Sequence, residues 1–179
     1  MNIAVFCSMY DVAEKYRQDA ETFARLLAKG GHTLVWGGTD QGLMHVIAEA
    51  AERGGARTVG VISERIKHTA YKTADEMVIV KDTLEMNRGL VERGDVIVVL
   101  VGGIGTLNEL TDVLRMKKNG LLDGNKRIVV INTDGFYGKF KEQLEKMSRE
   151  GFLKKEVMDS VHFAGTPEEG MRYIERNGN

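Results

Sequence analysis

The sequence has few of the residues that cross-link a small protein or divide it into parts. Its 179 residues include one cysteine, Cys7, and one proline, Pro167. An intramolecular disulfide and a cysteine-rich metal site are therefore excluded, and the lone thiol fits a reducing compartment. The chain has the length of one domain and no proline-rich linker, so we expect a single domain over residues 1–179.

Net charge and long apolar runs are also missing. Lys and Arg total 25 against 26 Asp and Glu, for a formal charge of -1. A duplex-binding surface shows a basic excess, so we do not expect nucleic acid as a partner. The apolar run Val96–Val101 has the length of a strand, far short of the roughly 18 residues of a membrane helix. The N-terminus resembles no targeting segment, and we expect a cytoplasmic protein without membrane contact.

The sequence does contain a regular alternation of strand-like and helix-like segments. Short β-branched runs cover residues 3–6, 33–36, 58–62, 77–80, 96–101 and 128–131, with a weaker one at 161–163. The longest are apolar at consecutive positions, which is typical of strands buried on both faces. Apolar residues at three- and four-residue spacing predict helices over 13–28, 43–53, 107–116 and 136–147, and Pro167 begins a last helix. This order predicts an α/β fold of three layers, with a parallel sheet of about seven strands.

Such a sheet binds ligands beyond the carboxyl ends of its strands, and glycines and hydroxyls gather there. They are Ser8, Gly37, Gly38, Thr39, Gly102, Gly103, Gly105 and Thr106. Glycines let the backbone approach a phosphate, and the free amides at a helix start bind anions. We therefore expect a phosphate-binding loop after the fifth strand. A capping box between Thr106 and Glu109 is the structural alternative there.

The segment Val101–Glu109 resembles the PGGxGTxxE signature of the LOG ("Lonely guy") family, also labelled as lysine decarboxylases. Trp36–Met44 resembles the YGGGxxGLMG motif of this family, and Val5–Ser8 resembles its VFCGSS opening. The resemblance covers nearly the whole chain. It implies an open Rossmann-like fold, a homodimer, and hydrolysis of a nucleoside 5′-monophosphate to a free base and ribose 5-phosphate. No motif argues for pyridoxal phosphate, the four histidines lack metal-ligand spacing, and we expect neither cofactor nor metal.

The resemblance also assigns roles to residues. Glu109 would be catalytic, because a carboxylate can stabilise positive charge on the ribose and orient or deprotonate the attacking water. Arg88 would bind the phosphate or help the base to leave. Gly102, Gly103, Gly105 and Thr106 would cradle the phosphate, and Gly37, Gly38, Thr39 and Ser8 would line the sugar or base. Apart from the resemblance, Met86 and Met44 could flank a flat base, although a core methionine is the commoner explanation. Asp112 could raise the pKa of Glu109 or bind ribose hydroxyls, unless it is a solvated helix acid.

One departure from the family pattern keeps alternatives open. Counting back from Asp95 puts Met86 at the arginine of the family and Asn87 at its lysine, so that Arg88 falls two residues late. The Asn87–Arg88 pair also resembles DprA-like and molybdenum-cofactor-carrier-like proteins. The first hypothesis is therefore a hydrolase, and the second is a non-catalytic carrier of a nucleotide or pterin phosphate. A nucleic-acid-binding module is the third. Met116 and 121–122 are candidates for a dimer contact.

Overall fold

The structure, a computed structural model, describes residues 1–122 and 126–177. Its described part contains one sheet in the order β4-β3-β2-β1-β5-β6-β7, in which every neighbouring pair is parallel. The strands are β1 (Asn2–Phe6), β2 (Thr33–Trp36), β3 (Thr58–Ser63), β4 (Glu76–Val80), β5 (Val96–Val99), β6 (Arg127–Ile131) and β7 (Val161–Ala164). The predicted α/β fold with a seven-stranded parallel sheet is confirmed.

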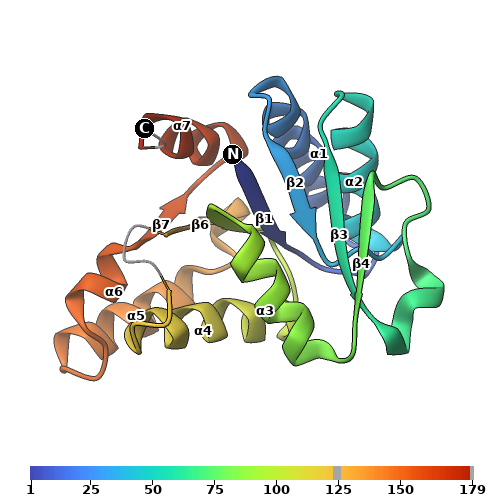
Figure 1. Ribbon diagram of the computed structural model, residues 1–179. Helices are drawn as coiled ribbons and strands as arrows, with labels where there is room; N and C mark the ends of the chain where they lie inside the picture. Colours follow the sequence, from blue (N-terminus) through green and yellow to red (C-terminus); the bar gives the residue numbers. More distant parts are fainter. Residues whose placement is uncertain (123–125, 178–179) are drawn as a thin grey trace.

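Helices cover both faces of the sheet and complete the three layers (Figure 1). One face packs against α1 (Glu14–Lys29), α2 (Gly42–Arg53) and α7 (Pro167–Arg176). The other packs against α3 (Thr83–Arg93), α4 (Ile104–Lys118), α5 (Gly138–Arg149) and α6 (Lys155–Asp159). Short 3₁₀ turns occupy Glu64–Thr69 and Thr133–Gly135. Successive strand residues point to opposite faces, so Val98 belongs to the first of these two cores and Val99 to the second.

The strand order reverses beside β1, and this reversal positions the site. The chain moves outward from β1 to β4 and then returns to place β5 on the other side of β1. The connections that leave β1 and β5 therefore diverge to opposite faces. A crevice opens between them, at the carboxyl ends of the strands, where open α/β sheets bind their ligands.

The start of α4 differs from the expected capping box. The helix begins at Ile104 with Gly103 as its N-cap, in extended backbone, and no side chain caps it. Thr106 thus lies inside the first turn, and the capping-box alternative is wrong. At the start of α7, by contrast, Thr166 caps the helix by accepting a bond from the Glu169 amide at 3.2 Å, and Glu169 accepts one from the amide of Gly165, the residue before the cap, at 2.7 Å.

None of the helices in 1–122 and 126–177 is long and apolar enough to cross a membrane.

Candidate active site

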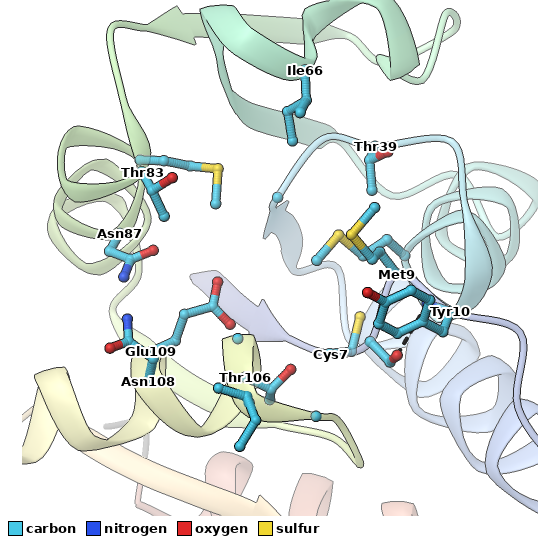
Figure 2. Close-up of a pocket in the computed structure, with 17 residues that line it drawn as sticks. Cys7, Met9, Tyr10, Thr39, Ile66, Thr83, Asn87, Thr106, Asn108 and Glu109 are labelled. Carbon is cyan, nitrogen blue, oxygen red and sulfur yellow. Dashed lines mark hydrogen bonds between the residues drawn. The ribbon is translucent and has the colours of Figure 1, made fainter.

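A cavity of about 230 Å³ lies at the carboxyl ends of β1, β2 and β5 (Figure 2). It is lined by Cys7, Ser8, Met9, Tyr10, Gly37, Thr39, Met44, Ile66, Thr83, Met86, Asn87, Gly103, Ile104, Gly105, Thr106, Asn108 and Glu109. Among these described lining residues there is no lysine and no arginine. Most of the predicted site residues are thus brought together, in a cavity whose lining supplies no cationic side chain.

Glu109 supplies the carboxyl group of the cavity. It lies in the second turn of α4, is only 7% exposed, and points into the cavity (Figure 2). Burial raises its pKa to about 8, because desolvation penalises the charged carboxylate and no described cation compensates. Burial, and then the nearby Glu109, also raise the pKa of the Cys7 thiol. At neutral pH both groups therefore remain mostly protonated.

The turn between β5 and α4 brings backbone amides to the same cavity. The first residues of a helix have N–H groups without an intrahelical partner, and Gly103, Ile104, Gly105 and Thr106 line the cavity there. Gly102 lies beneath the turn, where a Cβ atom would come within 2.1 Å of the Thr106 hydroxyl oxygen. The Tyr137 hydroxyl donates to the Leu100 carbonyl at 2.9 Å and braces the turn from behind. The arrangement can bind an anion.

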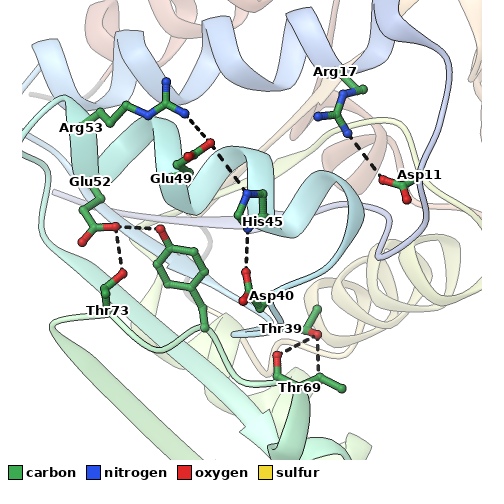
Figure 3. Close-up of polar contacts among 11 residues, drawn as sticks. Asp11, Arg17, Thr39, Asp40, His45, Glu49, Glu52, Arg53, Thr69 and Thr73 are labelled. Atoms are coloured by element: carbon green, nitrogen blue, oxygen red, sulfur yellow. Dashed lines mark hydrogen bonds and ion pairs between the residues drawn. The ribbon is translucent and has the colours of Figure 1, made fainter.

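The turn after β2 supplies part of the cavity wall. Gly37 and Thr39 line the cavity, but Gly38 does not: its φ of +69° turns the chain, and it packs on Met77. The Thr39 hydroxyl donates to the Thr69 hydroxyl at 2.8 Å (Figure 3). Ser8 lines the cavity and accepts a bond from the Tyr10 amide at 3.0 Å. The hydroxyl groups of Thr39 and Ser8 thus hold the turns of the cavity wall in place through hydrogen bonds within the protein.

His45 stands where the LOG motif has a glycine, but it lies outside the cavity. Its Nδ1 is 2.6 Å from Asp40 and its Nε2 is 3.7 Å from Glu49 (Figure 3). The side chain is half-exposed on α2 and belongs to a surface network.

Consecutive residues of α3 face different ways, and this separates Asn87 from Arg88. Met86 and Asn87 line the cavity, whereas the Arg88 side chain is 74% exposed and donates to Glu92 at 2.6 Å. A helix turns about 100° per residue, so Arg88 lies about 200° from Met86 and falls on the exposed side of α3. The structure does not bring Arg88 into the cavity.

Asp112 also lies outside the cavity. It accepts a bond from Arg115 at 2.8 Å, one turn further along α4. Burial alone accounts for the raised pKa of Glu109, so the expectation that Asp112 raises it is wrong. Asp112 is a helix acid outside the cavity, paired with Arg115, in agreement with the alternative interpretation.

Some lining residues were not expected from the sequence: Met9, Tyr10, Ile66, Thr83, Ile104 and Asn108. Three of them, Met9, Ile104 and Asn108, are next to expected residues, and their place in the sequence could have indicated them. Ile66 is different, since it comes from a 3₁₀ turn held by the Thr39–Ala70 bridge and by Thr69. Across the described ranges, no three His, Cys, Asp or Glu side chains lie close enough to hold a metal ion.

Comparison with known proteins agrees with the fold and the motifs. A family model described as "Possible lysine decarboxylase" matches residues 44–174. The chain is 35% identical to the cytokinin riboside 5′-monophosphate phosphoribohydrolase of Rhodococcoides fascians, over 85% of this chain and 78% of that protein. The enzyme of the same name from Mycobacterium marinum is 31% identical, over 89% and 85%. The chain therefore belongs to the LOG family.

Among solved structures, the chain is similar to the molybdenum cofactor binding protein from Rippkaea orientalis. The two superpose with a TM-score of 0.76 over 99% of this chain and 97% of that one, at 21% identity. This likeness shows a shared fold.

Proposed function

We propose that the protein hydrolyses the N-glycosidic bond of a nucleoside 5′-monophosphate, a cytokinin ribotide or a related adenine nucleotide, to the free base and ribose 5-phosphate. The observation that carries the proposal is Glu109, a carboxyl buried in the wall of a cavity whose rim offers helix-start amides to a phosphate. The names of the Rhodococcoides and Mycobacterium relatives support the same reaction.

In this reaction Glu109 acts as the general base. The water oxygen bonds to C1′ of the ribose, and Glu109 takes one proton from that water. The C1′–N bond breaks with its electron pair on the base, which then takes up a proton from solvent. A pKa of about 8 suits the role, because a base works best when its pKa lies near the operating pH.

The remaining walls fit the other parts of the nucleotide. The phosphate would bind the amides of the turn at 103–106, near the mouth, where Ile104 is exposed. The base would lie against the apolar side chains of Met9, Met44, Met86 and Ile66. Thioethers adapt to flat rings and make favourable contacts with them.

Product analysis on AMP, N6-isopentenyl-AMP, GMP, CMP and UMP tests the proposal. We expect release of base and ribose 5-phosphate from an adenine nucleotide, lost in Glu109→Gln. Glu92→Gln makes the same change outside the cavity, beside Arg88, and should stay active. Cleavage of none of the five nucleotides by the wild type would overturn the proposal.

One observation favours a second candidate, a carrier that holds a nucleotide or pterin phosphate without cleaving it. The described cavity wall has no cationic side chain, and Arg88 pairs with Glu92 outside it. Tight retention of such a ligand, together with no cleavage, would support the carrier.

We also propose that the protein is a homodimer and acts in the cytoplasm. Leu121 is exposed and available for a contact, whereas Met116 and Leu122 pack partly against the core. Light scattering at several protein concentrations would test the dimer.

A further inference from the structure

Asn87 is a buried polar residue whose polar atoms have no partner in the described chain. Its side chain is 4% exposed, and neither Oδ1 nor Nδ2 makes a hydrogen bond within 1–122 and 126–177. It nevertheless lines the cavity, on the α3 side, with Glu109 on α4 facing the same space (Figure 2). A buried amide without partners lowers stability, so a position of this kind calls for an explanation.

The surroundings of Asn87 would suit an apolar residue. Met86 and Leu90 on the same helix are both buried in the core. Asp82 caps α3 by accepting a hydrogen bond from the Glu85 amide at 3.0 Å and so fixes the residue at which the helix begins. The helix therefore holds an amide in the cavity wall where leucine would give a more stable protein, which indicates that the amide serves a ligand.

The chemistry of the amide narrows the choice of ligand group. An amide donates through nitrogen and accepts through oxygen at adjacent atoms, and it carries no charge. A phosphate offers acceptors only and would leave Oδ1 unpaired. Two neighbouring hydroxyls satisfy both atoms, since one accepts from Nδ2 while the other donates to Oδ1.

The arrangement of the cavity walls indicates where the ribose of a bound nucleotide would lie. Thr106 in the helix-start turn and Ile66 in the apolar wall lie on opposite sides of the cavity, and Asn87 and Glu109 face the space between them (Figure 2). The ribose of a bound nucleotide joins those two sides, and Glu109 must reach its C1′ atom. The 2′-hydroxyl is on the next carbon, followed by the 3′-hydroxyl.

We propose that Asn87 binds the 2′- and 3′-hydroxyls of the ribose through one donated and one accepted hydrogen bond. It thereby restricts the site to ribonucleotides. This role rests on the proposed function and deepens it, because it defines the sugar that the site accepts. Asn87 is then a specificity-determining residue, in contact with the substrate and without a part in the proton transfer.

The first test compares kcat/KM for AMP and for 2′-deoxy-AMP in the wild type and in Asn87→Leu. The intrinsic reactivity of the two nucleotides cancels when their ratio is compared between proteins. We expect the preference for AMP to fall by about 10- to 100-fold in Asn87→Leu, the range for an unpaired buried hydrogen-bonding group. Asn119→Leu removes an exposed amide outside the cavity, at the end of α4, and should leave the ratio within about twofold.

The second test measures binding, so that it does not depend on catalysis. Calorimetry on Glu109→Gln, with and without Asn87→Leu, gives Kd for AMP and for 2′-deoxy-AMP. If the wild type cleaved no nucleotide, the proposed function would be wrong. A tighter binding of AMP than of 2′-deoxy-AMP that disappears in Asn87→Leu would still support the role of Asn87. An unchanged ratio in Asn87→Leu, or no binding of either nucleotide, would overturn it. Thermal unfolding serves as the folding control, since Asn87→Leu should melt no lower than the wild type.

Discussion

Glu109 owes its protonation to burial, and this gives the reaction a defined pH dependence. A general base must be ionised, and its pKa is raised to about 8. We expect kcat/KM to rise about tenfold per pH unit below that value and to level off above it. Asp112→Asn should leave the midpoint unchanged, because Asp112 pairs with Arg115 at the surface. A rate that falls as pH rises through 8 would instead make Glu109 a general acid.

The LOG motif implies that Arg88 acts on the substrate, whereas the structure places its side chain outside the cavity. Its guanidinium is exposed and donates to Glu92 at 2.6 Å on the same helix. Arg88→Ala should therefore change kcat/KM for AMP by less than about threefold, since an exposed pair of this kind contributes little. Steady-state kinetics and inhibition by ribose 5-phosphate would check this. A loss of a hundredfold or more would mean that the side chain reaches the phosphate during turnover.

The turn between β5 and α4 depends on Gly102. A Cβ atom at this position would lie 2.1 Å from the Thr106 hydroxyl oxygen and 2.5 Å from its Cβ. Gly102→Ala must displace the first turn of α4, and we expect a loss of about 1–3 kcal/mol in unfolding free energy together with weaker nucleotide binding. Gly103→Ala is the matched control for the unfolding free energy, because nothing lies within 4 Å of its Cβ position. Denaturant unfolding and calorimetry of both variants distinguish the two cases.

The longest strands were predictable because consecutive apolar residues indicate burial on both faces, and each expected strand overlaps an observed one. The edge strand β4 differs, since its Ile79 is 52% exposed. Helix starts were harder. We expected a helix over 107–116, but α4 begins at Ile104, whose side chain is exposed and outside the apolar pattern. The five residues of α6 are too few for periodicity to show.

The parts of the site that lie in turns after strands were predictable from the sequence. The parts that depend on how a helix or turn packs against the rest of the chain were not. The Ser8 turn and the turn at 103–106 lie at the carboxyl ends of β1 and β5 by topology alone. The choice between Asn87 and Arg88 depends on how α3 is rotated against β3, which is a matter of tertiary packing. The Ile66 wall depends on contacts between segments about 30 residues apart, such as Thr39 with Thr69.

For the molecule as a whole, the buried carboxyl makes stability depend on pH. The pKa of Glu109 is about 8 in the folded protein and near its ordinary 4.5 in the unfolded chain. Between these values the unfolded chain releases a proton that the folded protein keeps, so unfolding becomes easier as pH rises from about 4.5 to about 8. The stability that the protonated carboxyl provides is thus complete at low pH and lost above 8.

Glu109→Gln should remove this dependence, because the amide stays neutral throughout. We expect the variant to be close to the wild type in unfolding free energy near pH 5. Near pH 9 it should be more stable by a few kcal/mol, since a tenfold change in a proton-binding constant corresponds to about 1.4 kcal/mol. Urea unfolding of both proteins at the two pH values measures the difference, and Glu92→Gln shows what the same change does at the surface. An advantage of Glu109→Gln that is equal at both pH values would contradict a carboxyl held protonated by burial. A higher unfolding free energy of Glu109→Gln near pH 9 would show that an ionisable group inside the cavity lowers the stability of the protein.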